Sequence, residues 1–199
     1  MKKQILIISG GDTFESYDDF LNYLKNTKAD IQRMKEIKDD WKPLLRENLG
    51  EEYEVFIPTM PNKYNAKYEE WKIWFEKIIP QLNDGLILIG HSLGASFLIK
   101  YLSENEIQRV IKALFLVGTP YDVDCFGFGL ASFALPEKIN MPTKNIFLYH
   151  SKDDFVVPFS AFEKYKVIFP NAIFKEFEDR THFIDDNFPE LSVDIKSLK

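Results

Sequence analysis

The sequence contains a single cysteine, Cys125, and only three histidines, His91, His150 and His182. One cysteine excludes an internal disulfide framework and a four-cysteine zinc site. Three dispersed histidines without an HExxH pair argue against a histidine-rich metal site. We therefore expect neither a metal nor another cofactor.

Basic residues are also in the minority. The 25 Lys and Arg residues face 31 Asp and Glu residues, which gives a formal net charge of -6. A protein that binds nucleic acid or anionic lipid needs a basic surface, so we expect neither nucleic acid nor a lipid membrane as a partner. No run approaches the about 18 apolar residues that a membrane span requires. The apolar run 5–8 is too short for a signal peptide and acidic residues follow it, so a cytoplasmic location is expected.

The chain is long enough for one ordinary domain with a substantial core. It has 199 residues, of which 45% are hydrophobic and 18 are Phe. Short apolar runs that favour strands recur along it, at Gln4–Ile8, Glu54–Ile57, Gly85–Ile89, Ala113–Val117, Asn145–Tyr149 and Ala172–Phe177. No repeat or linker divides the chain, so residues 1–199 are expected to form a single domain.

Helical spacing of apolar residues separates these runs. It predicts short helices between residues 14 and 39, a helix capped by Asp39 or Asp40 and ended by Gly50, and later helices over 68–82, Leu93–Asn105, Phe159–Ile168 and Asp185–Leu198. Alternation of strands and helices predicts a parallel α/β sheet with helices on both faces. Trp41, Trp71 and Trp74 are expected in its core.

The strongest chemical signal is the stretch Gly90-His91-Ser92-Leu93-Gly94. It follows an apolar strand and opens a helical pattern, which is the setting of a nucleophilic serine on a sharp strand-to-helix turn. The helix start also offers free backbone N–H groups for a developing oxyanion. The alternative interpretation is an ordinary turn in which Ser92 serves as the helix N-cap.

A serine nucleophile needs a base, and histidine is the usual one. His91 adjoins Ser92, so its side chain should point elsewhere, and His150 at the end of the fifth strand has the pattern of a packing residue. His182 lies in a polar loop after the last strand, so by elimination it is the predicted base. The carboxylate that orients the imidazole and stabilises its charged form is expected to be that of Asp154, with Asp153 left as an alternative in the same turn.

The motif Gly90–Gly94, the Asp154 turn with its Val157-Pro158 and the late His182 together resemble the α/β-hydrolase superfamily. The small size is similar to that of the compact serine hydrolases related to retinoblastoma-binding protein nine. The resemblance implies hydrolysis of an ester-type bond, carboxylic ester or thioester, through an acyl-enzyme on Ser92. Because the chain begins with a central strand, it also implies a six-stranded parallel sheet of order 2-1-3-4-5-6.

The resemblance further implies an oxyanion hole and two segments that cover the substrate pocket. One donor should be the N–H of Leu93 and the second the N–H of Gly11, with Gly10 or Asp12 as alternatives, since the family has His-Gly where Ser9-Gly10 stand here. Residues 13–39 are a predicted helical flap bearing Phe14, Tyr17 and Phe20, and residues 121–136 a small apolar cap. Both segments are alternatively ordinary core packing.

The sequence thus predicts a carboxylesterase-like serine hydrolase acting on a small-molecule acyl substrate, with its oligomeric state open. A scaffold that keeps the fold but binds a partner or ligand without catalysis is the main alternative. An acyltransferase or peptidase using the same three residues is another.

Overall fold

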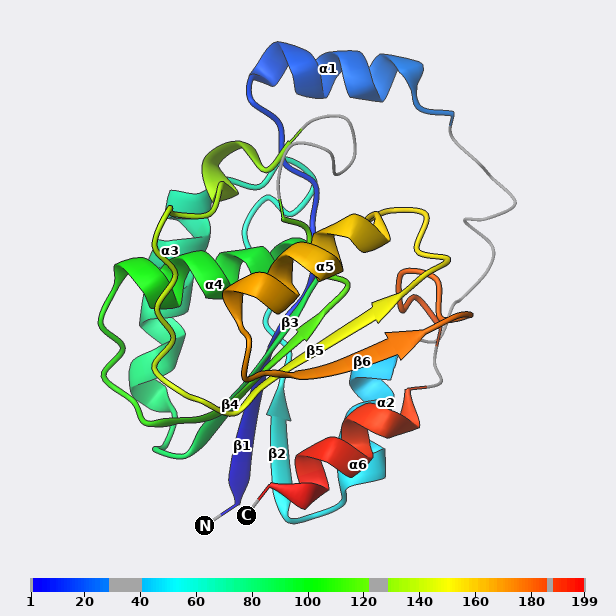
Figure 1. Ribbon diagram of the computed structural model, residues 1–199. Coiled ribbons are helices and arrows are strands. Elements are labelled where there is room, and N and C mark those ends of the chain that lie inside the picture. Colours follow the sequence, from blue (N-terminus) through cyan, green and yellow to red (C-terminus); the bar gives the residue numbers. More distant parts are fainter. Residues whose placement is uncertain (1, 29–40, 122–128, 186–187, 199) are drawn as a thin grey trace.

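A computed structural model describes residues 2–28, 41–121, 129–185 and 188–198. Its six strands form one parallel sheet of order β2-β1-β3-β4-β5-β6, as predicted (Figure 1). The strands are β1 Lys3–Ile8, β2 Tyr53–Phe56, β3 Leu86–His91, β4 Ile111–Val117, β5 Ile146–Ser151 and β6 Ile173–Phe177.

The helices connect the strands and cover both faces of the sheet. They are α1 Tyr17–Asn26, α2 Trp41–Leu49, α3 Tyr68–Ile78, α4 Leu93–Glu104, α5 Phe159–Ile168 and α6 Pro189–Ser197, with short 3-10 turns η2 Ile79–Gln81 and η3 Ala131–Phe133. No helix in these described parts of the chain is long and apolar enough to cross a membrane.

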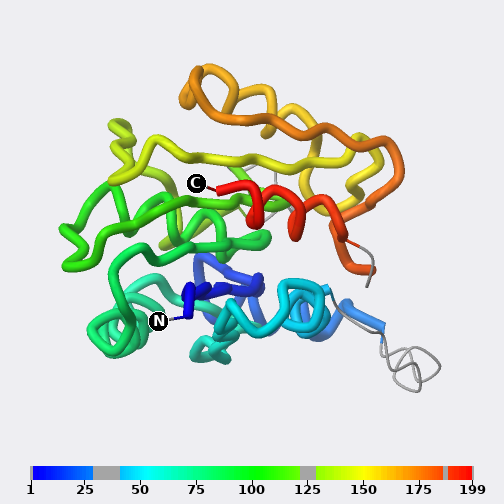
Figure 2. The backbone as a smooth tube through the Cα atoms, turned by 90° about the horizontal axis from the view of Figure 1, so that it is seen from below, coloured from blue at the N-terminus to red at the C-terminus, as the bar shows by residue number. Residues whose placement is uncertain are grey.

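Strand β1 shows why the central strands are apolar almost throughout. Leu6 and Ile8 pack into one core with α3, α4 and α5, whereas Ile5 and Ile7 pack into a second core with α2 and α6. All four side chains are fully buried, because successive residues of a strand point to opposite faces. Figure 2 shows α2 and α6 side by side under one face of the sheet.

Local signals set most helix boundaries. Ser16 and Asp19 form a reciprocal capping box that starts α1, although no residue of that helix is buried. Gly50, with φ of 81°, follows α2 as predicted. Helix α6 begins at Pro189 rather than at residue 185, because proline is favoured in the first turn. Residues 29–40, which include the later part of the predicted short helices and the predicted caps Asp39 and Asp40, lie outside the described residues.

The sheet places its central strand where chemistry is expected. Strand β3 lies between β1 and β4, and its carboxyl end continues directly into α4 through Ser92. The carboxyl ends of neighbouring parallel strands lie at the same edge of a sheet. The loops after β1, β3, β4, β5 and β6 therefore approach Ser92.

Candidate active site

Ser92 occupies a strained backbone position between β3 and α4. Its φ of 55° and ψ of -130° are rarely adopted by a residue with a side chain and cost on the order of 1–3 kcal/mol. The Ser92 N–H donates to the Val117 carbonyl at 2.8 Å, and the Ser92 carbonyl accepts from the Ala95 N–H at 2.8 Å. Ser92 is the N-cap residue of α4, but its hydroxyl makes no capping bond to the helix.

The glycines of the motif are required by close packing around this turn. A Cβ on Gly90 would collide with the backbone of Ala95, and one on Gly94 would collide with the carbonyl of Ile8. Gly10, from the loop after β1, approaches the serine itself, since a Cβ there would lie 2.8 Å from Ser92 Cβ and 3.3 Å from its Oγ. The turn thus brings the serine against the β1 loop.

His182 and Asp154 form a buried pair at the same sheet edge. His182 Nδ1–H donates to Asp154 Oδ2 at 2.8 Å, which leaves Nε2 of the imidazole for other chemistry. The second carboxylate oxygen, Oδ1, accepts from the backbone N–H groups of Val156 and Val157, each at 2.8 Å. Asp154, rather than Asp153, therefore contacts the imidazole, and the turn around Val157 fixes its carboxylate.

The His182 ring lies at the serine turn. Its centroid is 5.0 Å from that of His91, the residue that precedes Ser92. Gly118 closes the other side, because a Cβ there would lie 3.1 Å from His182 Cε1 and 3.5 Å from Asp154 Oδ2. Gly118 also has φ of 54° and follows Val117, whose carbonyl holds the Ser92 N–H.

The loop that carries His182 is strained and is held by side chains from other elements. Thr181 and Phe183, on either side of His182, have φ of 46° and 51°. Ahead of the histidine, Asp153 Oδ1 accepts from the Thr181 N–H at 2.9 Å and from the Ser151 hydroxyl at 2.6 Å. Asp153 therefore organises the histidine loop instead of contacting the imidazole.

Two ring N–H groups hold the loop at His182 and just beyond it. His91 Nε2–H donates to the backbone carbonyl of His182 at 2.9 Å, and Trp41 Nε1–H donates to the carbonyl of Phe183 at 3.0 Å. Both side chains are buried, and their rings meet edge to face. A carbonyl can only accept, so this bond fixes the His91 tautomer with its proton on Nε2.

Burial keeps the other two histidines neutral. The pKa of His91 is well below its usual value, first because the ring is desolvated and then because the Lys42 and His182 charges oppose its protonation. Burial also lowers the pKa of His150, whose Nε2–H donates to the Val157 carbonyl at 3.0 Å. His150 is thus a packing and hydrogen-bonding residue, as predicted.

The two candidate oxyanion donors share a cavity. Gly11 and Leu93 line one small cavity. The Asp12 N–H donates to the Lys63 carbonyl at 2.8 Å, so that group is already used and is a poor oxyanion donor. Among the described residues, no hydrogen bond engages the N–H of Gly11 or of Leu93.

The model of the family described as serine hydrolase matches residues 35–185, which include Ser92, Asp154 and His182. The chain belongs to the serine hydrolase family. It is also 27% identical, over 154 residues, to YdeN of Bacillus subtilis (strain 168), named as a hydrolase; the match covers 73% of this chain and 79% of that one.

Solved structures share the fold of this serine hydrolase. The crystal structure of the ydeN gene product from B. subtilis has a TM-score of 0.73 at 19% identity, covering 99% of this chain and 98% of that one. A lipase-esterase related protein from Clostridium acetobutylicum ATCC 824 has a TM-score of 0.60 at 11% identity, with 99% and 94% covered. At these identities the likeness establishes the α/β-hydrolase fold alone.

The described parts of the predicted flap and cap lie near the serine turn. Phe14 is buried ahead of α1 and lines the cavity beside Leu93 together with Tyr23, whereas Tyr17 is 64% exposed. Phe133 of the predicted cap packs in the core against Trp71. Residues 29–40 and 122–128 of the two segments lie outside the described residues.

Sequence reasoning missed how this serine hydrolase holds its histidine loop. Trp41 was expected to be an ordinary core residue, and nothing in its spacing indicates a bond to Phe183. His91 was expected only to point away from the serine. The one available signal was composition, since a polar residue predicted to be buried needs a partner. Trp74 was expected in the core, but it is 42% exposed on α3.

Proposed function

We propose that this protein is a serine esterase that cleaves a carboxylic ester or thioester of a small molecule through an acyl-enzyme on Ser92. The observation that carries the proposal is the strained serine turn packed beside a buried imidazole–carboxylate pair. A backbone strain of this kind persists where the surrounding structure over-determines it, and such positions cluster at catalytic sites.

His182 acts as the base. With Nδ1 bonded to Asp154, its Nε2 takes the proton of the Ser92 hydroxyl as Oγ attacks the substrate carbonyl. Asp154 stabilises the imidazolium that results. The tetrahedral intermediate then collapses, the bond to the leaving alcohol or thiol breaks, and the proton on Nε2 passes to that leaving group.

Water completes the cycle. It attacks the acyl-enzyme while His182 accepts its proton, and collapse of the second intermediate returns that proton to Ser92 Oγ and releases a carboxylic acid. The N–H groups of Leu93 and Gly11 are the proposed oxyanion donors, and the start of α4 adds its dipole. Apart from the substrate and this water, each proposed step uses groups of the chain. We propose that residues 1–199 act as one catalytic domain, with 13–39 and 121–136 covering the pocket.

A fluorophosphonate probe tests the nucleophile and p-nitrophenyl acetate tests turnover. We expect labelling and hydrolysis in the wild type, loss of both in Ser92→Ala, and retention of both in Ser103→Ala, a serine of the same helix whose hydroxyl bonds to the Ile99 carbonyl. Replacing His182 by Ala should lower turnover by several orders of magnitude, because the three residues act as a unit. A pure, folded wild type that neither labels nor hydrolyses the ester would refute the proposal and favour a non-catalytic scaffold.

A further inference from the structure

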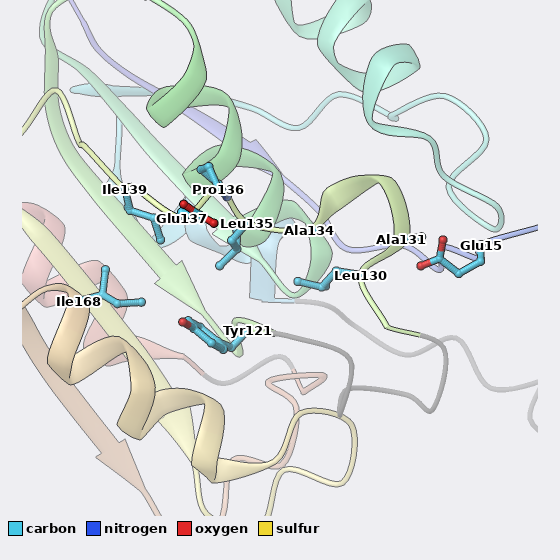
Figure 3. A pocket seen from close by; sticks show the side chains of 10 residues that line it. All are labelled: Glu15, Tyr121, Leu130, Ala131, Ala134, Leu135, Pro136, Glu137, Ile139 and Ile168. Carbon is cyan, nitrogen blue, oxygen red and sulfur yellow. The ribbon is translucent and has the colours of Figure 1, made fainter.

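Two cavities share Leu130 in their lining, and the first of them borders the serine turn at Leu93. The first, of about 110 Å³, is lined by Gly11 and Leu93, the proposed oxyanion donors, and also by Phe14, Tyr23 and Leu130. The second, of about 400 Å³, lies beyond Leu130, which lines both. Figure 3 shows the second cavity, with Tyr121, Leu135 and Ile168 around a common space.

We infer that the first cavity is the acyl subsite, that it accepts a short acyl group without negative charge, and that Leu130 is the wall that sets the chain length. This inference rests on the proposed function. A cavity of 110 Å³ has room for about four heavy atoms, if each takes roughly the 30 Å³ of a liquid water. An acyl group of butyrate size therefore fills it, and a longer chain meets Leu130.

The backbone around Leu130 makes this wall rigid. Gly129 and Ala131, on either side of it, have φ of 68° and 46°, and the Leu130 carbonyl accepts from the Phe133 N–H at 2.8 Å. Leu130 is itself only 3% exposed. A chain that needs more room cannot displace this side chain without disturbing the turn.

The same short segment is tied to the core on its far side. The Ser132 hydroxyl accepts from the Tyr68 N–H at 3.0 Å, and Lys100 Nζ donates to the carbonyls of Ser132 and Ala134 at 3.1 and 3.0 Å. Phe133 is fully buried against Trp71. These contacts hold Leu130 from behind, so the wall is a fixed part of the fold.

The charge of the cavities selects against anionic acyl groups. Asp12 lines the first cavity, and Glu15 and Glu137 line the second, whereas no Lys or Arg lines either one in the described residues. Burial raises the pKa of Asp12, and the Lys63 charge opposes that rise, so the carboxyl sits in a poorly solvated place. A second negative charge there would be repelled by the Asp12 carboxylate, and Lys63, whose charge acts on Asp12, does not line the cavity.

Chain length is tested with the p-nitrophenyl esters of acetate, butyrate and octanoate. We expect wild-type kcat/KM to be highest for butyrate and at least tenfold lower for octanoate. Leu130→Ala should join the two cavities and raise the octanoate-to-butyrate ratio of kcat/KM at least tenfold. A single methylene group in a fitted pocket already changes kcat/KM by about that factor. Leu135→Ala, which enlarges only the second cavity, should leave the ratio unchanged. An octanoate preference in the wild type, or equal ratios in both variants, would overturn the inference.

Charge is tested with the p-nitrophenyl monoester of succinate, whose acyl chain matches butyrate in length but ends in a carboxylate. We expect its kcat/KM to be at least tenfold below that of the butyrate ester, and Asp12→Asn to narrow this gap. Equal rates for the two esters in the wild type would contradict the assigned charge preference.

A binding measurement separates this inference from the proposed chemistry. Ser92→Ala should bind butyramide, seen by shifts in its NMR spectrum, more tightly than octanamide, and adding Leu130→Ala should reverse the order. If the wild type hydrolyses nothing but this pattern holds, the proposed function fails and the short-acyl subsite stands. If hydrolysis is seen but the amides show no such order, the subsite fails alone.

Discussion

The bond from His91 to the carbonyl of His182 should control how well the histidine loop is placed. Replacing His91 by Leu puts a smaller, apolar side chain in place of the imidazole and removes the donor, so the buried His182 carbonyl loses its 2.9 Å partner. His91→Gln is the matched variant, because its side-chain amide N–H reaches to about the position of Nε2. The two variants therefore differ chiefly in whether they can donate.

The size of the effect follows from what else holds the loop. Leaving a buried carbonyl unsatisfied costs about 1–3 kcal/mol. Strain at Thr181 and Phe183, on the order of 1–3 kcal/mol each, already favours release of the loop, while the bond from His182 Nδ1 to Asp154 opposes it. If most of the cost of the unsatisfied carbonyl is borne by the loop, the population of molecules with His182 in its catalytic position falls by about tenfold, at about 1.4 kcal/mol for each factor of ten.

Steady-state hydrolysis of p-nitrophenyl acetate between pH 6 and 9 measures this directly. We expect His91→Leu to lower kcat about tenfold with KM nearly unchanged, and His91→Gln to recover most of the loss. A purely structural defect would lower the melting temperature of both variants equally without separating their kcat values. Wild-type kcat in His91→Leu, or equal loss in Leu and Gln variants, would refute the role assigned to His91.

Two further predictions follow from the glycines and the neutral histidines. Gly118→Ala should lower the free energy of unfolding by about 1–2 kcal/mol because of its positive φ, and it should also lower kcat because the new Cβ would lie 3.1 Å from His182 Cε1. Gly85→Ala is the control, since Gly85 has φ of 78° but open space around it. Urea unfolding and steady-state kinetics should show for Gly85→Ala the loss of stability without the loss of kcat. Because burial lowers the pKa of His91 and His150 in the native state, the unfolded chain binds protons below about pH 6.5 that the native chain does not. The free energy of unfolding should therefore fall as pH drops from 7 to 5, by up to about 1.4 kcal/mol per pH unit for each histidine. The fall should be shallower in His150→Gln. A free energy of unfolding that rises over this range, or the same slope in the variant as in the wild type, would contradict the prediction.

The order of the sheet and the serine turn could be predicted because each depends on short-range pattern. Strands buried on both faces are apolar at nearly every position, and β1, β3 and β4 are of this kind. The Gly90 position likewise follows from crowding against Ala95 within the turn, whereas Gly94 is required by the close approach of Ile8 in β1. Helix α6 was placed too early because its apolar spacing extends ahead of Pro189, where the helix begins.

The choice between Asp153 and Asp154 required the structure. Both lie in one turn after β5, and the sequence favoured Asp154 only through its spacing from Val157. The deciding facts are the backbone N–H groups of Val156 and Val157, which hold one carboxylate oxygen of Asp154 while the other faces His182. Backbone donors are identical in every sequence, so no residue pattern could reveal where they point.

The same reasoning explains why the strain at the site was invisible in the sequence. Among the described residues, the non-glycine positions with positive φ are Asn62, Ser92, Ala131, Thr181 and Phe183. Four of these belong to the serine turn, the histidine loop or the turn around Leu130, yet none is a residue type that favours this conformation. Their conformations persist because distant groups, among them the Val117 carbonyl and the Trp41 and His91 ring N–H groups, bond to the strained segments. The positions that chemistry needs are thus set by long-range contacts, and local preference at those residues opposes them.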